Sequence, residues 1–151
     1  MSYWDTSALL KLYVTEPDSP AFLALAAGTQ KVVTGFIGKY EARAVFRRRE
    51  AVKLLTAGGG DSCYQKLVEH AARGRLEMVA ESDLLEHEYG VILERCLSQT
   101  PPVFIRTNDA LHLAAATVAG EAEFVSADTR QRIAAAFLGF SVLPAVFPIT
   151  A

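Results

Sequence analysis

The segment SADTRQR, residues 126–132, follows the apolar run EFV at residues 123–125 and precedes a helical pattern over residues 133–138. It places a carboxylate, Asp128, where a buried strand is expected to end and a helix to begin. Aspartate at such a position accepts hydrogen bonds from the free backbone N–H groups of the helix. Asp128 is therefore either a helix cap alone or a cap that also belongs to a functional site.

Length and composition limit the class of protein. The 151 residues, 51% hydrophobic and 21% charged, suffice for one domain with a sizeable core and are too few for two ordinary domains. We therefore expect residues 1–151 to form a single domain. The formal net charge of -2 gives no global signal for nucleic acid, so a polyanion would need local cations or a bound metal ion.

Cysteine usage and hydropathy indicate the compartment. Cys63 and Cys96 lie far apart, with neither a disulfide framework nor a zinc-site spacing. No stretch approaches the roughly 20 apolar residues of a membrane span, and the amino terminus shows no basic segment before a long apolar run. We expect a cytoplasmic protein without a membrane partner.

Short apolar runs alternate with helical patterns along the chain. Strands are expected over residues 1–5, 31–34, 76–80, 124–126 and 140–143. Helices are expected over residues 6–14, 20–27, 37–55, 62–73, 83–97, 110–119 and 133–138. The glycine-rich segment 56–61 is expected to be a flexible joint within the domain.

This alternation predicts an α/β fold. Parallel strands require crossover connections, so we expect a mainly parallel sheet of about five strands with helices on both faces. The order of the strands cannot be derived from the pattern. In such sheets, polar sites gather beyond the carboxyl ends of the strands. Asp5 and Asp128 both follow a predicted strand and fit this rule.

Four carboxylates lie near predicted strand-to-helix transitions: Asp5, Glu41, Asp109 and Asp128. Taken singly, Asp109 is explained as a helix cap and Glu41 as a charge near the positive end of its helix. Together at one sheet edge they would repel, by about 1 kcal/mol per pair at ~4 Å even in water. A hard divalent cation, Mg²⁺ or Mn²⁺, prefers oxygen ligands and would neutralise them.

Four stretches of the chain carry a resemblance to a known family. They are YWDTSALLKLY at 3–13, EARA at 41–44, RTNDALHLA at 106–114 and FVSADTR at 124–130. In this order they resemble the PIN domain, most closely the toxin nucleases of VapBC toxin–antitoxin pairs, over nearly the whole chain. One departure is Gly35 after Thr34, where the family often has a serine. It affects a supporting hydroxyl and none of the carboxylates.

The resemblance implies an endoribonuclease that depends on Mg²⁺ or Mn²⁺ and has an acidic pocket of Asp5, Glu41, Asp109 and Asp128. Asp5, Asp109 and Asp128 are the expected metal ligands, whereas Glu41 either binds metal through water or orients the attacking water. Thr6 and Ser126 match hydroxyl positions that support such a pocket. The resemblance also implies a homodimer and a separately encoded antitoxin.

Local cations are candidate contacts for RNA phosphates: Arg43, Arg47, Arg106 and Arg130. A solvated helix face, or a docking surface for an acidic partner, explains these cations equally well. His112 is expected to pack or to form hydrogen bonds rather than to catalyse. The alternative to an enzyme is a non-catalytic PIN-fold module that binds RNA or protein and uses the acidic pocket for a structural ion.

Overall fold

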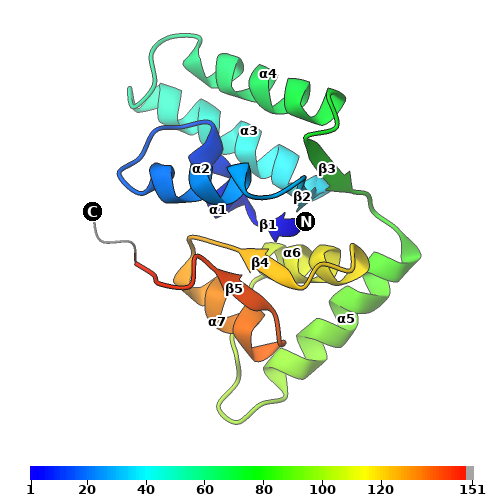
Figure 1. The fold of residues 1–151 in the computed structure, drawn as a ribbon. Coiled ribbons are helices and arrows are strands. Elements are labelled where there is room, and N and C mark those ends of the chain that lie inside the picture. The colour runs from blue at the N-terminus through cyan, green and yellow to red at the C-terminus, as the bar shows by residue number, and fades with distance from the viewer. Residues whose placement is uncertain (149–151) are drawn as a thin grey trace.

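The computed structural model describes residues 1–148, whose strands form one five-stranded sheet (Figure 1). All strand pairs are parallel, and the order across the sheet is β3-β2-β1-β4-β5. The strands are β1 (Ser2–Trp4), β2 (Val32–Gly35), β3 (Leu76–Val79), β4 (Glu123–Val125) and β5 (Ser141–Leu143). The predicted α/β class and parallel sheet are confirmed, and β1 lies at the centre.

Within residues 1–148, seven α-helices and one short 3₁₀ helix accompany the strands. They are α1 (Thr6–Leu9), η1 (Leu10–Leu12), α2 (Ser19–Ala27), α3 (Phe36–Ala51), α4 (Gly59–Ala72), α5 (Asp83–Leu97), α6 (Thr107–Val118) and α7 (Thr129–Phe137). Helices α1 to α4 cover one face of the sheet and α5 to α7 cover the other (Figure 1). Helices on both faces are therefore confirmed.

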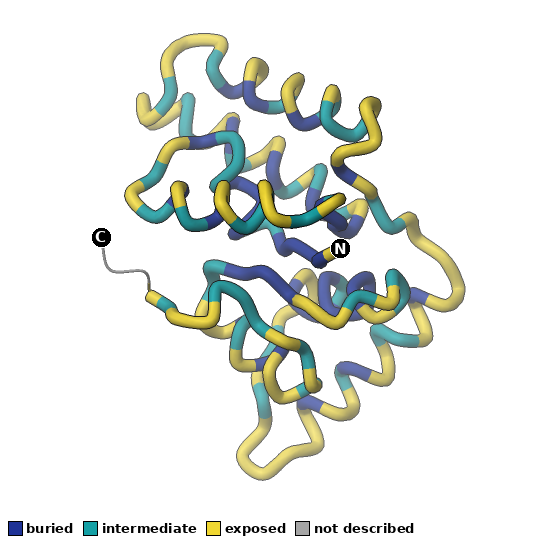
Figure 2. The backbone as a smooth tube through the Cα atoms, in the orientation of Figure 1, coloured by how far each residue is buried: buried dark blue, intermediate teal, exposed yellow. Residues whose placement is uncertain are grey.

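The two faces of the sheet carry separate cores because neighbouring strand residues point in opposite directions. Tyr3 and Phe124 pack against α5, α6 and α7, whereas Trp4 and Val125 pack against the α1 to α4 layer. All four side chains are fully buried. Figure 2 shows the buried backbone concentrated in the central strands and on the inner sides of the helices. The ends of the central strands thus rest on two packed cores.

The first helix is shorter than predicted. The expected helix over residues 6–14 breaks into α1 and η1, and the N–H of Tyr13 donates to the carbonyl of Leu10 at 3.0 Å. Helix ends often tighten into such 3₁₀ turns. Pro17, shortly afterwards, provides no N–H to extend a helix. The prediction of one continuous helix was wrong.

The second half of the predicted flexible joint at residues 56–61 is helical. Helix α4 begins at Gly59, and the carboxylate of Glu50 accepts the N–H groups of Gly58 and Gly60 at 3.2 and 2.8 Å. A Cβ atom at Gly60 would lie 3.0 Å from the carbonyl oxygen of Phe46. Here glycine permits the close approach of α3 and α4, a role that composition alone does not distinguish from flexibility.

Two further boundaries differ from the predicted ones. Helix α3 ends at Ala51 instead of Leu55, and Lys53 adopts a left-handed backbone with φ 61°. Helix α6 begins at Thr107, three residues before the predicted start, because the side chain of Asp109 accepts the backbone N–H of Arg106 at 3.1 Å. Asp109 therefore lies inside the first turn.

None of the helices in residues 1–148 combines the length and the apolar character needed to cross a lipid bilayer. The interpretation of residues 1–151 as a single domain stays a prediction.

Candidate active site at the carboxyl ends of the strands

Asp5 directly follows the central strand β1 and is 3% exposed. Its carboxylate caps α1 by accepting the N–H of Ala8 at 3.0 Å, and it also accepts the Ser7 hydroxyl at 2.7 Å. The Ser126 hydroxyl donates to the second carboxylate oxygen at 2.5 Å. Three donors thus fix the orientation of Asp5.

The environment of Asp5 opposes its ionisation. Burial raises the pKa of this carboxyl above its ordinary value, although the charge of His112 and the hydrogen bond from Ser126 act in the opposite direction. A buried carboxylate is costly unless a positive charge lies close to it. A positive charge close to Asp5 would therefore favour its ionised form.

Ser126 connects the two carboxylates that follow β1 and β4. Its hydroxyl donates to Asp5 and accepts the backbone N–H of Asp128 at 3.0 Å. Ser7 adds a parallel link, because its hydroxyl oxygen accepts the N–H of Ala127 at 2.8 Å. The loops after two adjacent strands are thereby held together.

Glu41 lies in the second turn of α3 and faces the amino-terminal part of α6. Its carboxylate accepts hydrogen bonds from the hydroxyl of Thr6 and from Asn108 at 2.8 Å, and Nε2 of His112 lies 2.7 Å away. Burial acts to raise the pKa of Glu41, but the bonds from His112, Thr6 and Asn108 outweigh it and lower this pKa to about 2. Glu41 is therefore ionised at neutral pH.

A buried tyrosine sets the orientation of His112. Nδ1 of His112 lies 2.7 Å from the hydroxyl of Tyr3, and burial raises the pKa of Tyr3 well above its ordinary value. The Tyr3 hydroxyl therefore keeps its proton, and Nε2–H of His112 donates to the Glu41 carboxylate. His112 hydrogen-bonds inside the protein, as predicted.

Asp109 and Asp128 share a cation from the protein itself. Nε of Arg106 lies 3.0 Å from Asp109, and Nη2 lies 3.4 Å from Asp128. Asp128 also caps α7 by accepting the N–H groups of Arg130 and Gln131 at 2.8 and 3.2 Å. Both explanations offered for Asp128, a helix cap and a member of an acidic cluster, therefore describe the same side chain.

The four predicted RNA-contacting arginines divide into two groups. Arg106 lies at the acidic site through its guanidinium, whereas Arg130 contacts Asp128 through its backbone N–H. Arg43 and Arg47 lie against α4 instead: the guanidinium of Arg43 is 4.7 Å from the ring centre of Tyr64, and that of Arg47 is 3.7 Å from the carboxylate of Asp61. The structure does not bring this second pair to the carboxylates.

Three side chains at this edge had no assigned role in the sequence analysis. Tyr3 and Asn108 orient Glu41 directly or through His112. Arg132 donates to the carbonyls of Ser126 and Leu143, each at 2.9 Å, and so holds the loops after β4 and β5. Asn108 lies within the stretch RTNDALHLA, and Arg132 is the last residue of SADTRQR. Their place in these stretches is the sequence signal for their roles.

The departure at Gly35 has a steric reason. A Cβ atom at this position would lie 2.8 Å from the Tyr3 hydroxyl and 3.3 Å from Cβ of Ala115. A serine would therefore displace the hydroxyl that binds His112. The neighbouring Thr34 hydroxyl donates instead to the backbone carbonyl of Trp4 at 2.8 Å, which ties β2 to β1.

The donor set fits a hard divalent cation that keeps part of its water shell. Asp5, Asp109 and Asp128 offer carboxylate oxygens, the ligands that Mg²⁺ and Mn²⁺ prefer. In the described part of the chain, no three His, Cys, Asp or Glu side chains are gathered closely enough to hold a metal ion by themselves. An open set of carboxylates completed by water matches the coordination habit of Mg²⁺.

The family of the chain follows from its sequence profile. The PIN domain profile matches residues 2–136, which include all four carboxylates. The chain belongs to the PIN domain family. No curated protein matches the sequence.

Solved structures share the fold of this PIN domain. A toxin–antitoxin complex from Klebsiella pneumoniae is 16% identical, with a TM-score of 0.62 over 97% of this chain and 98% of that one. Mycobacterium tuberculosis VapC20, a toxin that cleaves the sarcin-ricin loop, is 17% identical, with a TM-score of 0.64 over 89% and 95%. VapBC2 from Rickettsia felis, bound to a promoter DNA fragment, is 16% identical, with a TM-score of 0.65 over 94% and 97%. At these identities the likeness establishes the fold.

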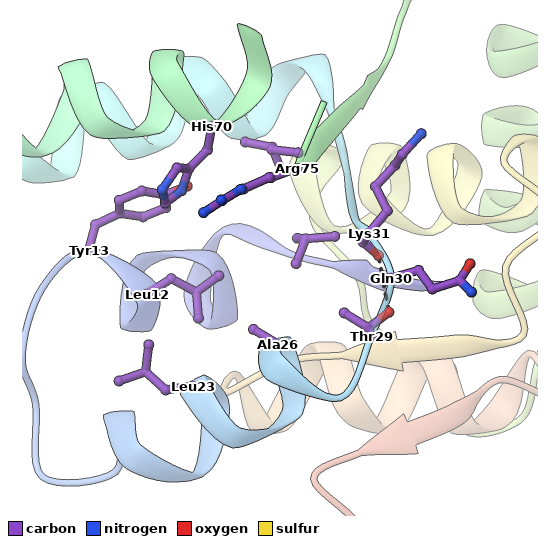
Figure 3. A pocket seen from close by; sticks show the side chains of 11 residues that line it. Leu12, Tyr13, Leu23, Ala26, Thr29, Gln30, Lys31, His70 and Arg75 are labelled. Carbon is purple, nitrogen blue, oxygen red and sulfur yellow. Dashed lines mark hydrogen bonds between the residues drawn. The ribbon is translucent and has the colours of Figure 1, made fainter. Parts of the chain in front are cut away.

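A cavity of about 330 Å³ lies away from the acidic site, at the amino ends of β2 and β3, and none of the predicted site residues lines it. Figure 3 shows Arg75 beside the paired rings of Tyr13 and His70, above a floor that includes Leu12 and Ala26. Nδ1 of His70 lies 3.0 Å from the Tyr13 hydroxyl. The acidic site and this cavity thus occupy opposite ends of the strands.

Proposed function

We propose that this PIN domain is a metal-dependent endoribonuclease that hydrolyses RNA phosphodiesters at the acidic edge of its sheet. The observation that carries the proposal is that four carboxylates, from four separate parts of the chain, lie at one edge of the sheet in two hydrogen-bonded groups. Ser126 and Arg106 join Asp5, Asp128 and Asp109, and the second group holds Glu41 through Asn108 and His112. Burial of Asp5, which raises the pKa of its carboxyl, adds to this support.

The oxygens of Asp5, Asp109 and Asp128 would hold Mg²⁺ or Mn²⁺. Such an ion, when bound, lowers the pKa of a coordinated water and neutralises charge on the reacting phosphate. Ser126 would keep Asp5 oriented toward the ion through its 2.5 Å hydrogen bond. Asp128 would keep its position through the N–H groups of α7.

Glu41 would orient the attacking water. Its pKa of about 2 keeps it ionised, and Thr6, Asn108 and His112 hold it in place. A fixed carboxylate can accept a hydrogen bond from water and align it with a phosphodiester. The Tyr3–His112 contact acts behind Glu41 and would position it without touching RNA.

Arg106 and Arg130 would contact the RNA backbone. Arg106 is 61% exposed at its side chain and can turn from Asp109 and Asp128 toward a phosphate once a metal ion neutralises these carboxylates. Arg43 and Arg47 would contact only more distant phosphates, since they lie against α4.

We further propose that the enzyme is the toxin of a cytoplasmic toxin–antitoxin pair and acts as a homodimer. The Klebsiella pneumoniae structure is described as a toxin–antitoxin complex and the Rickettsia felis structure as VapBC2, which supports a separately encoded antitoxin as partner. The two cysteines are free, as is usual in a reducing compartment.

One observation favours a second candidate, a non-catalytic PIN-fold module that binds RNA or protein. The guanidinium of Arg106 already bridges Asp109 and Asp128, so the acids have a counter-ion without any metal. In this case the protein would bind RNA without cutting it in either Mg²⁺ or Mn²⁺.

The test is incubation of the purified protein with a mixed RNA pool in Mn²⁺ or Mg²⁺, followed by mapping of the cut ends. We expect discrete cleavage that disappears with EDTA and with Asp5→Asn. The variant should lose more than about 100-fold in rate, because groups outside the ligand shell already cost 10- to 100-fold. Wild-type cleavage by a folded Asp5→Asn protein would refute the assignment, and RNA binding without turnover would support the second candidate.

A further inference from the structure

A hollow of about 250 Å³ lies beside the acidic site, between the amino-terminal part of α3 and helices α5 and α6. Its walls include Phe36 and Tyr40 from α3, Leu111 from α6, Val79 at the end of β3, and Glu81 just beyond it. We refer to it as the α3–α6 hollow. None of its lining residues is cationic.

The α3–α6 hollow adjoins the proposed catalytic carboxylate. Tyr40 immediately precedes Glu41, and Leu111 follows Asn108 by three residues on α6. Because Asn108 donates to Glu41 at 2.8 Å, the same two helices that line the hollow also meet at the acidic site. The hollow is therefore within reach of a chain that presents a phosphate to the carboxylates.

Two exposed aromatic rings dominate one wall. Phe36 and Tyr40 are 40% and 63% exposed, and their ring centres lie 5.5 Å apart at an interplanar angle of 65°. Unpaired nucleobases stack on aromatic side chains of this kind. Nζ of Lys39 lies 5.6 Å from the Phe36 ring centre and adds a positive charge for a backbone phosphate.

Glu81 supplies the carboxylate of the hollow. A glutamate accepts a hydrogen bond from the exocyclic amino group of a base such as cytosine, and uracil has no such group.

We propose that the α3–α6 hollow is a nucleobase subsite that stacks a single-stranded base on Phe36 and Tyr40 and selects, through Glu81, an amino-bearing base over uracil. The inference rests on the proposed function, since it specifies the RNA that reaches the acidic site. In this proposal Phe36, Tyr40 and Glu81 determine which base is bound, and the carboxylates of the acidic site carry out the hydrolysis.

The experiment compares wild type with Tyr40→Ala, Tyr40→Phe and Glu81→Gln. Fluorescence anisotropy in EDTA measures affinity for labelled oligo-C and oligo-U, and cut ends are mapped in a randomised single-stranded RNA pool with Mn²⁺. Phe137→Ala is the matched control, because Phe137 is 38% exposed on α7 and does not line the hollow.

We expect wild type to prefer oligo-C and to cut beside amino-bearing bases. Tyr40→Ala should weaken oligonucleotide binding about 5- to 150-fold, whereas Tyr40→Phe, which keeps the ring, should stay within about twofold of wild type. Glu81→Gln should remove the preference for cytosine over uracil and keep the overall affinity. The control should match wild type in both assays.

Three results separate the hypotheses. Unchanged affinity and base preference in Tyr40→Ala would overturn the subsite and leave the ribonuclease proposal intact. Absence of cleavage by wild type would refute the proposed function, while the binding assay would still decide the subsite. A change from dimer to monomer in Tyr40→Ala, with base preference unchanged, would identify the hollow as a protein interface and overturn the inference.

Discussion

The hydroxyl of Tyr3 lies 2.7 Å from Nδ1 of His112, and this buried contact ties the central strand to the helix that carries Asp109. The other ring nitrogen of His112 lies 2.7 Å from Glu41. The position of the Glu41 carboxylate thus depends on Tyr3, a side chain in the core beneath the sheet.

Replacement of Tyr3 by phenylalanine tests this dependence. Tyr3→Phe keeps the ring and removes the hydroxyl, so a buried nitrogen of His112 loses its partner. We expect the free energy of unfolding to fall by about 1–3 kcal/mol in urea titrations. Tyr40→Phe is the control, because Tyr40 is 63% exposed and its loss of a hydroxyl should not change stability. Equal stability of Tyr3→Phe and wild type would contradict the role of the contact.

A double-mutant cycle tests the steric reason for Gly35. Gly35→Ser places a Cβ atom 2.8 Å from the Tyr3 hydroxyl, and we expect it to destabilise the protein by about 1–3 kcal/mol. In the Tyr3→Phe background this penalty should shrink, because the clashing oxygen is gone. Strictly additive effects in urea unfolding would show that the two residues do not interact.

The lowered pKa of Glu41 predicts a stability that depends on pH. The pKa is about 2 in the folded protein against an ordinary 4.5, so the folded state favours the ionised form. The contribution is complete above pH 4.5 and is lost as the pH falls toward 2; it amounts to at most about 3 kcal/mol. The difference in unfolding free energy between wild type and Glu41→Gln should shrink over this range. A difference that does not vary with pH would contradict the assignment.

Removal of the Arg106 guanidinium should change the affinity for metal and the affinity for RNA in opposite directions. Arg106→Gln frees Asp109 and Asp128, and we expect Mn²⁺ to bind up to about fivefold more tightly, in line with the small energy of an exposed ion pair. RNA should bind more weakly, since a phosphate contact is lost. Calorimetric titration with Mn²⁺ measures the first effect, with Arg130→Gln as control. Weaker Mn²⁺ binding by Arg106→Gln would contradict competition between the guanidinium and the ion.

Two glycines within helices should respond to alanine with opposite signs. Gly60→Ala places a Cβ atom 3.0 Å from the Phe46 carbonyl, and we expect a loss of about 1–3 kcal/mol. Gly90→Ala on α5 meets no atom within 4 Å and should stabilise the protein by about 0.5–1 kcal/mol. Thermal unfolding of both variants provides the measurement. A stable Gly60→Ala variant would show that α3 and α4 can separate without cost.

The sequence predicts those features that depend on local pattern. Apolar runs such as Phe124–Val125 mark the strands, and Asp5 and Asp128 are visible as the carboxylates that end them. The strand order and the division of the arginines depend on contacts between distant segments. Arg106 and Arg47 look equivalent in the sequence, yet only Arg106 meets the acidic edge.

The roles of Tyr3 and Gly35 were beyond sequence reasoning for the same reason. Tyr3 is an ordinary strand aromatic until α6 places His112 against it. In the sequence, Gly35 only marks the loss of a hydroxyl. The position of Tyr3 shows that a Cβ atom at Gly35 would collide with the Tyr3 hydroxyl. Each role is a property of a pair of residues, so neither partner reveals it alone.

The bridge from Arg106 to Asp109 and Asp128 means that the protein carries its own counter-ion. Folding then has no need of a metal ion, and a chelator should stop turnover without unfolding the chain. For the proposed nuclease, the supply of Mg²⁺ or Mn²⁺ would then control activity reversibly without changing the fold.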